Sequence, residues 1–223
     1  MIITIDQSLV RILPDFTVIP FVMDVSIQNS DEIKELVGQY EKKIAEEYSL
    51  EEVLNIPLIK EGRDGYKKLG KDPSRYRLAV ESLYRRIVKG NSLYLINNVV
   101  DTGNILSLAT MRSIAVLDYH QIQGSVLIRL GRNDDEYYGI GRGLLNVSNI
   151  PIYEDEIGPF GSTTSDTLRT SITAHTKTIL IFIICFSHSF LDEHKQLAKE
   201  LFAKYAHAQN IRELDVKITS VED

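Results

Sequence analysis

The stretch that decides how this chain is interpreted is KDPSRYRLAVESLYRRIVKGNSLYLINNVVDTGNILSL, residues 71–108. Its first half has the signals of a helix, because Asp72 can cap the N-terminus and Pro73 suits the first helical position. Gly90 is typical of the residue that follows a helix C-terminus. The apolar run from Ser92 to Val100 then predicts a short buried strand, followed by the polar start of a second helix.

Five polar side chains fall together at the end of this stretch. They are Asn97, Asn98, Asp101, Asn104 and Ser107. On a helix, the last three would lie along one side because they recur at steps of three. Asn and Asp favour helix ends for local reasons, so capping accounts for any one of them. As a group beside an apolar strand, they would also line a polar ligand site, and both interpretations stay open.

A second polar stretch is GPFGSTTSDTLRTSIT, residues 158–173. Eight of the twelve residues from Ser162 to Thr173 carry hydroxyl groups, which both donate and accept hydrogen bonds. Such a loop can hold a ribose, a carboxylate or an ammonium group, and plain surface-loop composition is the alternative. The candidate substrate-binding residues are Ser107, Ser162, Thr163, Ser165 and Arg169, and Asp166 is a candidate catalytic residue.

The charge distribution permits one basic face on an acidic protein. The chain carries a net charge of -6, which argues against indiscriminate nucleic-acid binding. Residues 60–89 nevertheless hold ten basic and four acidic side chains. Arg75, Arg85 and Arg86 are therefore candidates for phosphate contacts, although a solvated helix surface gives the same count.

Composition indicates an ordinary globular protein. The chain has 223 residues, of which 43% are hydrophobic and 25% charged, enough for a substantial core. No apolar run approaches the roughly 18 residues of a membrane span, and residues 1–6 carry no basic segment. The single cysteine, Cys185, lies inside the apolar run 179–186 and has no partner for an internal disulfide. We therefore expect a cytoplasmic protein with no membrane partner.

Conventional metal or hydrolase motifs do not appear in the sequence. The five histidines show neither HExxH spacing nor pairing with a second cysteine, so we expect no metal site and no cofactor. A GxSxG nucleophile motif is also missing.

The remaining segments predict an alternation of helices and strands. Strands are expected at residues 2–5, 17–27, 114–117, 125–130, 136–140, 150–153 and 179–186, with an edge strand in 214–218. A helix should begin after Asn29 or Ser30, a short one at the Ser49/Glu52 capping box, and a third should span 191–207. The glycine-spaced segment 62–70 is expected to be a loop or a short helical turn.

Several of these segments together resemble a known domain. They are YKKLG, DPSRY, ESLYRRIVKG, LYLINNVVDTGNILSL, LDYHQIQG and DEIGPFGSTTSDTLRTSITAHTK, within residues 62–187. The succession resembles the B3/B4 domain of the phenylalanine–tRNA ligase β chain, in a free-standing form. The resemblance implies an α+β fold, with a β-sandwich-like core and helices packed on it. Residues 1–61 would then pack on this core, and 188–223 would add a helix and an edge strand.

The resemblance also implies a function. In the ligase, the cleft of this domain accepts the 3′ end of a mischarged tRNA and hydrolyses the ester of the wrong amino acid. The matching positions are Asn97, Asn98, Asp101 and Asn104, with the loop 161–169. The resemblance therefore implies that these four residues, with Asp166, are the candidate catalytic residues. In the ligase, the wrong amino acid is typically tyrosine. Here Ala115 stands where the family has a histidine, and the Ser/Thr-rich segment replaces the glycine-rich loop whose glutamate recognises the amino acid, so tyrosine specificity is not carried over. Without class II synthetase motifs, the chain is not expected to charge tRNA by itself.

Three functional hypotheses follow from these observations. The first is a deacylase acting in trans on misacylated tRNA or a related small aminoacyl ester, with the tRNA 3′ end as its partner. The second is a noncatalytic RNA-binding module, and the third is a small-metabolite enzyme that kept the pocket and lost the RNA. The sequence gives no indication of the amino acid, the tRNA or the oligomeric state.

Overall fold

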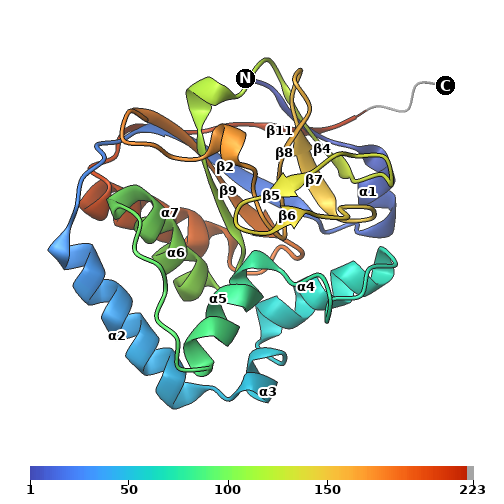
Figure 1. Ribbon diagram of the computed structural model, residues 1–223. Coiled ribbons are helices and arrows are strands. Elements are labelled where there is room, and N and C mark those ends of the chain that lie inside the picture. Colours follow the sequence, from blue (N-terminus) through green and yellow to red (C-terminus); the bar gives the residue numbers. More distant parts are fainter. Residues whose placement is uncertain (220–223) are drawn as a thin grey trace.

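The computed structural model describes residues 1–219 and has an α+β fold built in layers (Figure 1). Two β-sheets pack face to face, and their shared core includes Ile3, Val126 and Phe160 from one sheet and Leu117 and Phe182 from the other. The other face of the second sheet is covered by helices. This arrangement confirms the fold class expected from the sequence.

The first sheet has the strand order β11-β1-β4-β7-β8. Its strands are β1 (Ile3–Ile5), β4 (Val126–Leu130), β7 (Pro151–Glu154), β8 (Pro159–Ser162) and β11 (Val216–Ile218). The pairs of β1 with β11 and with β4 are parallel, and the pairs of β7 with β4 and with β8 are antiparallel. The expected C-terminal edge strand is therefore confirmed as β11.

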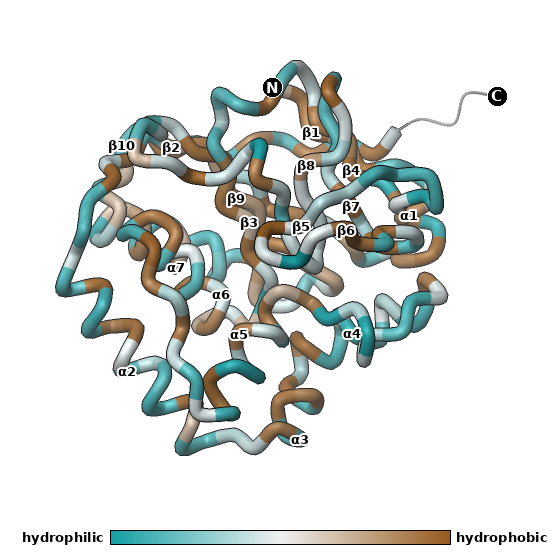
Figure 2. Tube along the Cα trace, viewed as in Figure 1, coloured by the Kyte–Doolittle hydropathy of each residue, from teal (hydrophilic) through white to brown (hydrophobic). Residues whose placement is uncertain are grey.

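The second sheet has the order β10-β2-β9-β3 and is antiparallel. Its strands are β2 (Thr17–Asp24), β3 (Ile114–Asp118), β9 (Thr178–Cys185) and β10 (Gln209–Glu213). The whole of β2 pairs with β9, and both strands are buried on their two faces, which explains their nearly continuous hydrophobic sequences (Figure 2). A small hairpin, β5 (Tyr138–Gly139) with β6 (Gly143–Leu144), lies apart from the two sheets.

The helices form two groups. Their bounds are α1 (Gln7–Ile12), α2 (Asp31–Glu47), α3 (Leu50–Val53), α4 (Pro57–Lys68), α5 (Ala79–Val88), α6 (Asn98–Thr110) and α7 (Leu191–Tyr205), with single 3₁₀ turns η1 (Tyr119–Gln121) and η2 (Leu168–Thr170). α6 and α7 pack on the second sheet through Val99, Leu106, Ala198 and Phe202. α2 to α5 form a separate helical core against α6. Among residues 1–219, no helix has the length and apolar character that crossing a membrane requires.

The expected helix start at Asp72 is wrong. α5 begins only at Ala79, and the Asp72 carboxylate instead accepts a hydrogen bond from the Ser74 backbone N–H (2.8 Å). Tertiary contacts keep this segment out of the helix. The buried Lys71 ammonium donates to the Ser148 carbonyl (2.7 Å), and Arg63 donates to the Pro73 carbonyl (3.3 Å).

The strand expected at residues 92–100 is also wrong. The Asn97 side chain caps α6, accepting hydrogen bonds from the backbone N–H groups of Val99 and Val100, so the end of the apolar run is helical. Residues 91–97 have no regular secondary structure. The helix cap at Asn97 therefore determines the local structure here, although the apolar pattern is typical of a strand.

The glycine-spaced segment 62–70, expected to be a loop or a short helical turn, is mostly the second half of the longer helix α4, which runs to Lys68. Its glycines allow close packing. A Cβ atom on Gly65 would lie 2.5 Å from Cδ1 of Phe186, and one on Gly62 would lie 2.4 Å from Cδ1 of Leu78. The capping box at Ser49 and Glu52 is confirmed at the start of α3.

A buried ionic cluster ties the irregular loop after β4 to the first sheet. The Arg129 guanidinium, only 5% exposed, donates to both carboxylate oxygens of Asp135 (2.8 and 2.9 Å) and to both of Glu154, with Nη2 at 2.9 Å from Oε1. These contacts hold the pKa of Asp135 below its usual value. The cluster fixes the base of the segment that carries the β5–β6 hairpin.

Candidate functional site

A cavity of about 280 Å³ opens between α6, β3 and the segment around η2. The β5–β6 turn closes one side of it through Ile140. Seven aliphatic side chains form most of its wall: Ile96, Val100, Ile114, Val116, Ile140, Leu168 and Ile172. Gly103, Asn104, Asp166, Thr170 and Ser171 complete it. The cavity is therefore apolar with a few polar groups, which is the usual character of a small-ligand site.

The close approach of α6 to β3 shapes the cavity wall. A Cβ atom on Gly103 would lie 2.4 Å from Cγ2 of Val116, so only glycine allows this distance. Ile114 and Val116 face the cavity, and Ala115 between them packs into the core between the two sheets. The position that the resemblance assigned to a histidine thus points away from the cavity.

We expect Gly103→Ala to lower the free energy of unfolding by about 1–3 kcal/mol, because the added methyl group overpacks the contact with Val116. Urea unfolding would measure this. Gly38→Ala is the matched control, since Gly38 lies in α2 and a Cβ atom there meets nothing within 4 Å. That control should be stabilised by about 0.5–1 kcal/mol, and equal stability of the Gly103 variant and the wild type would contradict the packing argument.

Asn104 and Asp166 are the two candidate catalytic residues that line the cavity. The Asn104 side chain is partly exposed and bonds to no other side chain or backbone group within residues 1–219. Oδ1 of Asp166 is buried and has no hydrogen-bond partner there. Burial raises the pKa of Asp166 to about 7, with a backbone hydrogen bond from Ser162 opposing the shift. The cavity thus contains a carboxyl group that titrates near neutral pH and a free amide.

The structure gives Asn97 and Asn98 local roles. Asn97 caps α6. Asn98 is buried, and its side chain bonds to the backbone of Ser26, Gln28 and Tyr205, which ties α6 to the segment after β2 and to the end of α7. Neither side chain lines the cavity, so their catalytic assignment stays a prediction without support from this geometry.

Asp101 and Ser107 also bond to the backbone. The buried Asp101 carboxylate accepts from the Ile96 N–H (3.0 Å), and burial raises its pKa while this hydrogen bond opposes the change. The Ser107 hydroxyl donates to the Arg112 carbonyl (2.6 Å). Asp101 therefore acts on the cavity indirectly, because it positions Ile96 in the wall.

Most hydroxyl groups at the start of the hydroxyl-rich stretch already form hydrogen bonds within the protein. Ser162 Oγ accepts from the backbone N–H of Ser165 (3.0 Å) and donates to the Ser165 carbonyl (2.7 Å), which closes a tight turn. The Thr163 hydroxyl pairs with the buried Tyr66 hydroxyl. Ser162, Thr163 and Ser165 therefore do not line the cavity, whereas Thr170 and Ser171 of the same stretch do.

Arg169 holds the same segment in place. Its guanidinium forms two hydrogen bonds with the Asp155 carboxylate (2.9 and 2.8 Å) and a third with the Gly158 carbonyl (3.1 Å). The side chain of Asp155 is fully buried. Arg169 thereby positions η2, which carries Leu168 and Thr170 into the cavity wall.

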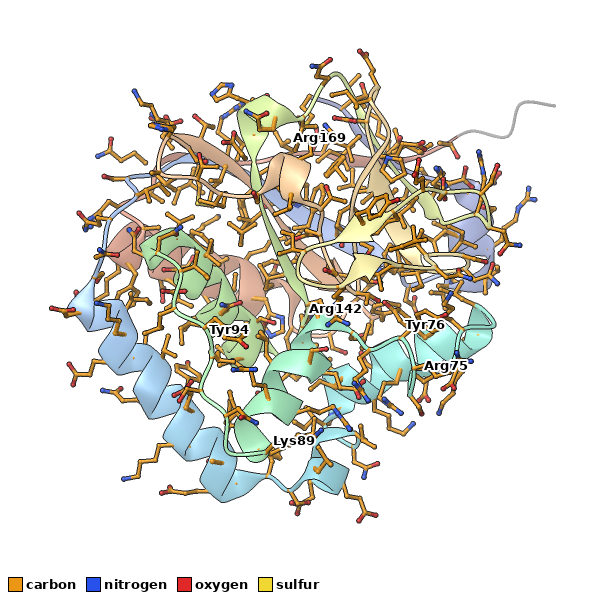
Figure 3. The ribbon with its side chains drawn as sticks, viewed as in Figure 1. Arg75, Tyr76, Lys89, Tyr94, Arg142 and Arg169 are labelled. Atoms are coloured by element: carbon orange, nitrogen blue, oxygen red, sulfur yellow. The ribbon has the colours of Figure 1, made fainter. Side chains whose placement is uncertain are left out.

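The three candidate phosphate-binding residues lie in different settings. Arg75 is exposed, whereas Nη1 of Arg85 lies 3.9 Å from Oε1 of the buried Glu81. Arg86 lies over the Tyr94 ring, with its guanidinium carbon 4.1 Å from the ring centroid. Figure 3 shows Arg75 on the α4 side of the molecule and Tyr94 beside the segment leading to α6. The basic residues are thus spread over the surface, and no acidic side chain other than Asp166 lines the cavity.

Sequence reasoning missed two kinds of cavity residue. Thr170 and Ser171 belong to the hydroxyl-rich stretch, so that stretch carried a signal for them. The sequence contained no signal for the aliphatic wall residues. They come from α6, β3, the β5–β6 turn and η2, and only the tertiary fold brings them together.

Comparison with known proteins gives a consistent result. A family model described as the B3/4 domain matches residues 62–219. The fold is similar to the crystal structure of an N-terminal fragment of the phenylalanyl-tRNA synthetase beta-subunit from Pyrococcus horikoshii, with a TM-score of 0.54, 11% identity, and 98% of this chain and 52% of that chain covered. The chain thus spans about half the length of that fragment. No curated protein sequence matches.

Proposed function

This chain belongs to the B3/4 domain family, and from that premise we propose that it is a tRNA-associated deacylase that hydrolyses the ester of misacylated aminoacyl-tRNA in trans. The observation that carries the proposal is that Asn104 and Asp166 line the same mostly apolar cavity, and that Oδ1 of Asp166 has no hydrogen-bond partner among the described residues. The other predicted catalytic side chains, in contrast, are engaged with the backbone.

The dimensions of the cavity suit an aminoacyl group. A volume of about 280 Å³ is at the small end of ligand sites and accommodates a group of amino-acid size. Its aliphatic walls favour an apolar side chain, and the two polar groups offer hydrogen bonds to the ester. The tRNA body would remain outside.

The proposed reaction is a hydrolysis assisted by general base catalysis. A water molecule attacks the ester carbonyl carbon and gives a proton to the Asp166 carboxylate, which a pKa of about 7 makes an effective base near neutral pH. The Asn104 amide donates a hydrogen bond to the carbonyl oxygen as negative charge develops there. The bond to the ribose oxygen then breaks, that oxygen takes up the proton, and free amino acid and tRNA are released.

The test is release of amino acid from a panel of correctly and incorrectly charged tRNAs. Selective release by the wild type is expected, and Asn104→Ala should lower the rate by about 10²- to 10³-fold, as loss of one such donor does elsewhere. Asn133→Ala is the matched control, because Asn133 is exposed in the loop after β4 and does not line the cavity. Equal hydrolysis by the Asn104 variant would remove the role given to this residue.

Two other outcomes would assign a different function. Binding of tRNA without release from any panel member would indicate the noncatalytic RNA-binding module. If the protein neither releases amino acid nor binds tRNA, the result would favour the small-metabolite enzyme. Circular dichroism of each variant shows whether the fold is retained.

A further inference from the structure

Three consecutive large apolar side chains are exposed just before α6. The exposed fractions of Tyr94, Leu95 and Ile96 are 71%, 47% and 59%. Single exposed apolar residues are common on protein surfaces, but an exposed run of three is a defect unless a function requires it. The exposure of residues 94–96 therefore indicates a binding surface.

The segment is fixed in this exposed arrangement. Leu93 before it is buried in the helical core, and the Ile96 N–H donates to the buried Asp101 carboxylate at 3.0 Å. The Ser92 carbonyl accepts a hydrogen bond from Nε of Arg86 at 2.6 Å. Anchors on both sides thus present the three side chains to solvent, and a ligand would not have to order them on binding.

The Tyr94 ring is prepared for stacking. Arg86 covers one face of the ring, and the ring remains mostly exposed, so its other face is open. An exposed aromatic ring backed by a guanidinium group is the arrangement with which proteins hold unpaired nucleobases. The positive charge at this platform is that of Arg86, because Arg85 is ion-paired with the buried Glu81 and Figure 3 shows Lys89 at the end of α5, away from Tyr94.

The run also leads to the cavity. Ile96 forms part of the cavity wall and lies two residues after Tyr94. Two residues span at most about 7 Å, which is the length of about two stacked nucleotides at 3.4 Å each. A base on Tyr94 would thus place the following nucleotides at the cavity mouth.

We propose that Arg86, Tyr94, Leu95 and Ile96 form a binding track for the single-stranded 3′ end of an RNA, with a base stacked on Tyr94 and the terminal ester entering the cavity beside Ile96. The inference rests on the proposed function and names the surface that delivers its substrate. The Arg86 guanidinium against the Tyr94 ring favours a stacked nucleobase over a protein partner. Asp101 is a positioning residue in this arrangement, because it holds the Ile96 backbone.

The test is binding of a short fluorescent single-stranded RNA, followed by anisotropy and uncoupled from hydrolysis. Tyr94→Ala should weaken binding by about 5- to 150-fold, whereas Tyr94→Phe keeps the ring and should stay within about twofold of the wild type. Raising the salt concentration from about 50 to about 200 mM should weaken wild-type binding. Phe190→Ala serves as the control, since Phe190 is an aromatic residue of similar exposure (59%) outside the cavity lining.

The outcomes separate this inference from the proposed function. A Tyr94→Ala variant that binds RNA and hydrolyses charged tRNA like the wild type would overturn the track and leave the deacylase proposal standing. A wild type that binds no RNA would overturn both. A wild-type dimer that Tyr94→Ala dissociates, seen by size-exclusion chromatography without RNA binding, would instead make the run a self-association surface.

Discussion

Replacing Asp166 with asparagine is expected to lower the rate of ester hydrolysis by about 10²- to 10⁴-fold, because a positioned general base contributes a factor of this size. Asparagine keeps the shape of the side chain but cannot accept the proton. The measurement is single-turnover release of amino acid from the tRNA that the wild type hydrolyses best. A rate within a factor of about three of the wild type would exclude Asp166 as the base, because general base catalysis contributes far more.

The pH dependence gives an independent check on the same residue. Asp166 acts as the base only when ionised, so the wild-type rate should rise with pH through about 7 and then level off. The residual rate of Asp166→Asn should lack this inflection. A wild-type profile without an inflection near 7 would contradict the assignment.

The Asp166→Asn substitution should raise the stability of the fold although it lowers activity. Burial raises the pKa of Asp166 above its ordinary value of 3.8, so the folded protein binds this proton more tightly than the unfolded chain does. The carboxyl group therefore costs stability progressively as pH rises from about 4 to about 7, and the full cost persists above 7. Asp166→Asn should then melt at a temperature equal to or above that of the wild type at pH 8, which excludes unfolding as the cause of lost activity.

Arg129→Met should cause the largest loss of stability, about 3 kcal/mol in the free energy of unfolding. The substitution leaves Asp135, with a side chain only 10% exposed, and the partly buried Glu154 without their shared cation. We place the effect at the lower end of the range for broken buried ion pairs, because Glu154 can turn toward solvent. Urea unfolding measures the change, and a loss below about 1 kcal/mol would show that the cluster is no more than a surface ion pair.

Arg132→Met is the matched control for this prediction. Arg132 is an exposed arginine in the loop after β4, three residues further along the chain, and its side chain has no ion pair within residues 1–219. Its substitution should change stability by no more than about 0.5 kcal/mol.

The sequence predicted elements whose causes are local or strongly periodic. The run 179–186 became β9 because both of its faces are buried, and Ser49 with Glu52 formed the expected capping box. The family resemblance, drawn from motifs within residues 62–187, is confirmed by the match over 62–219. The division at residues 61 and 187 stays a prediction.

Two of the failures arose where distant residues decide the local structure. Lys71 and Arg63 hold the segment after Gly70 out of a helix, although Asp72 and Pro73 favour one locally. In the same way, Gly62 and Gly65 serve packing against side chains that the sequence does not identify as neighbours.

The candidate site likewise combines features that the sequence predicts with features that only the tertiary fold reveals. Asn104 and Asp166 could be named from the sequence, but the choice between them and Asn97, Asn98 or Asp101 required hydrogen-bond partners that only the fold supplies. Tyr94 was missed because the run around it was interpreted as a buried strand. Its exposure follows from the cap at Asn97, which starts α6 and leaves residues 91–97 without a partner strand.

The most direct test of the central claim is the amount of free amino acid released per mole of protein from a misacylated tRNA supplied in excess. The deacylase account predicts continued release of many moles per mole of protein, with intact tRNA recovered and little release from the correctly charged tRNA. Release that stops at or below one mole per mole of protein, or equals the rate of spontaneous hydrolysis, would contradict it.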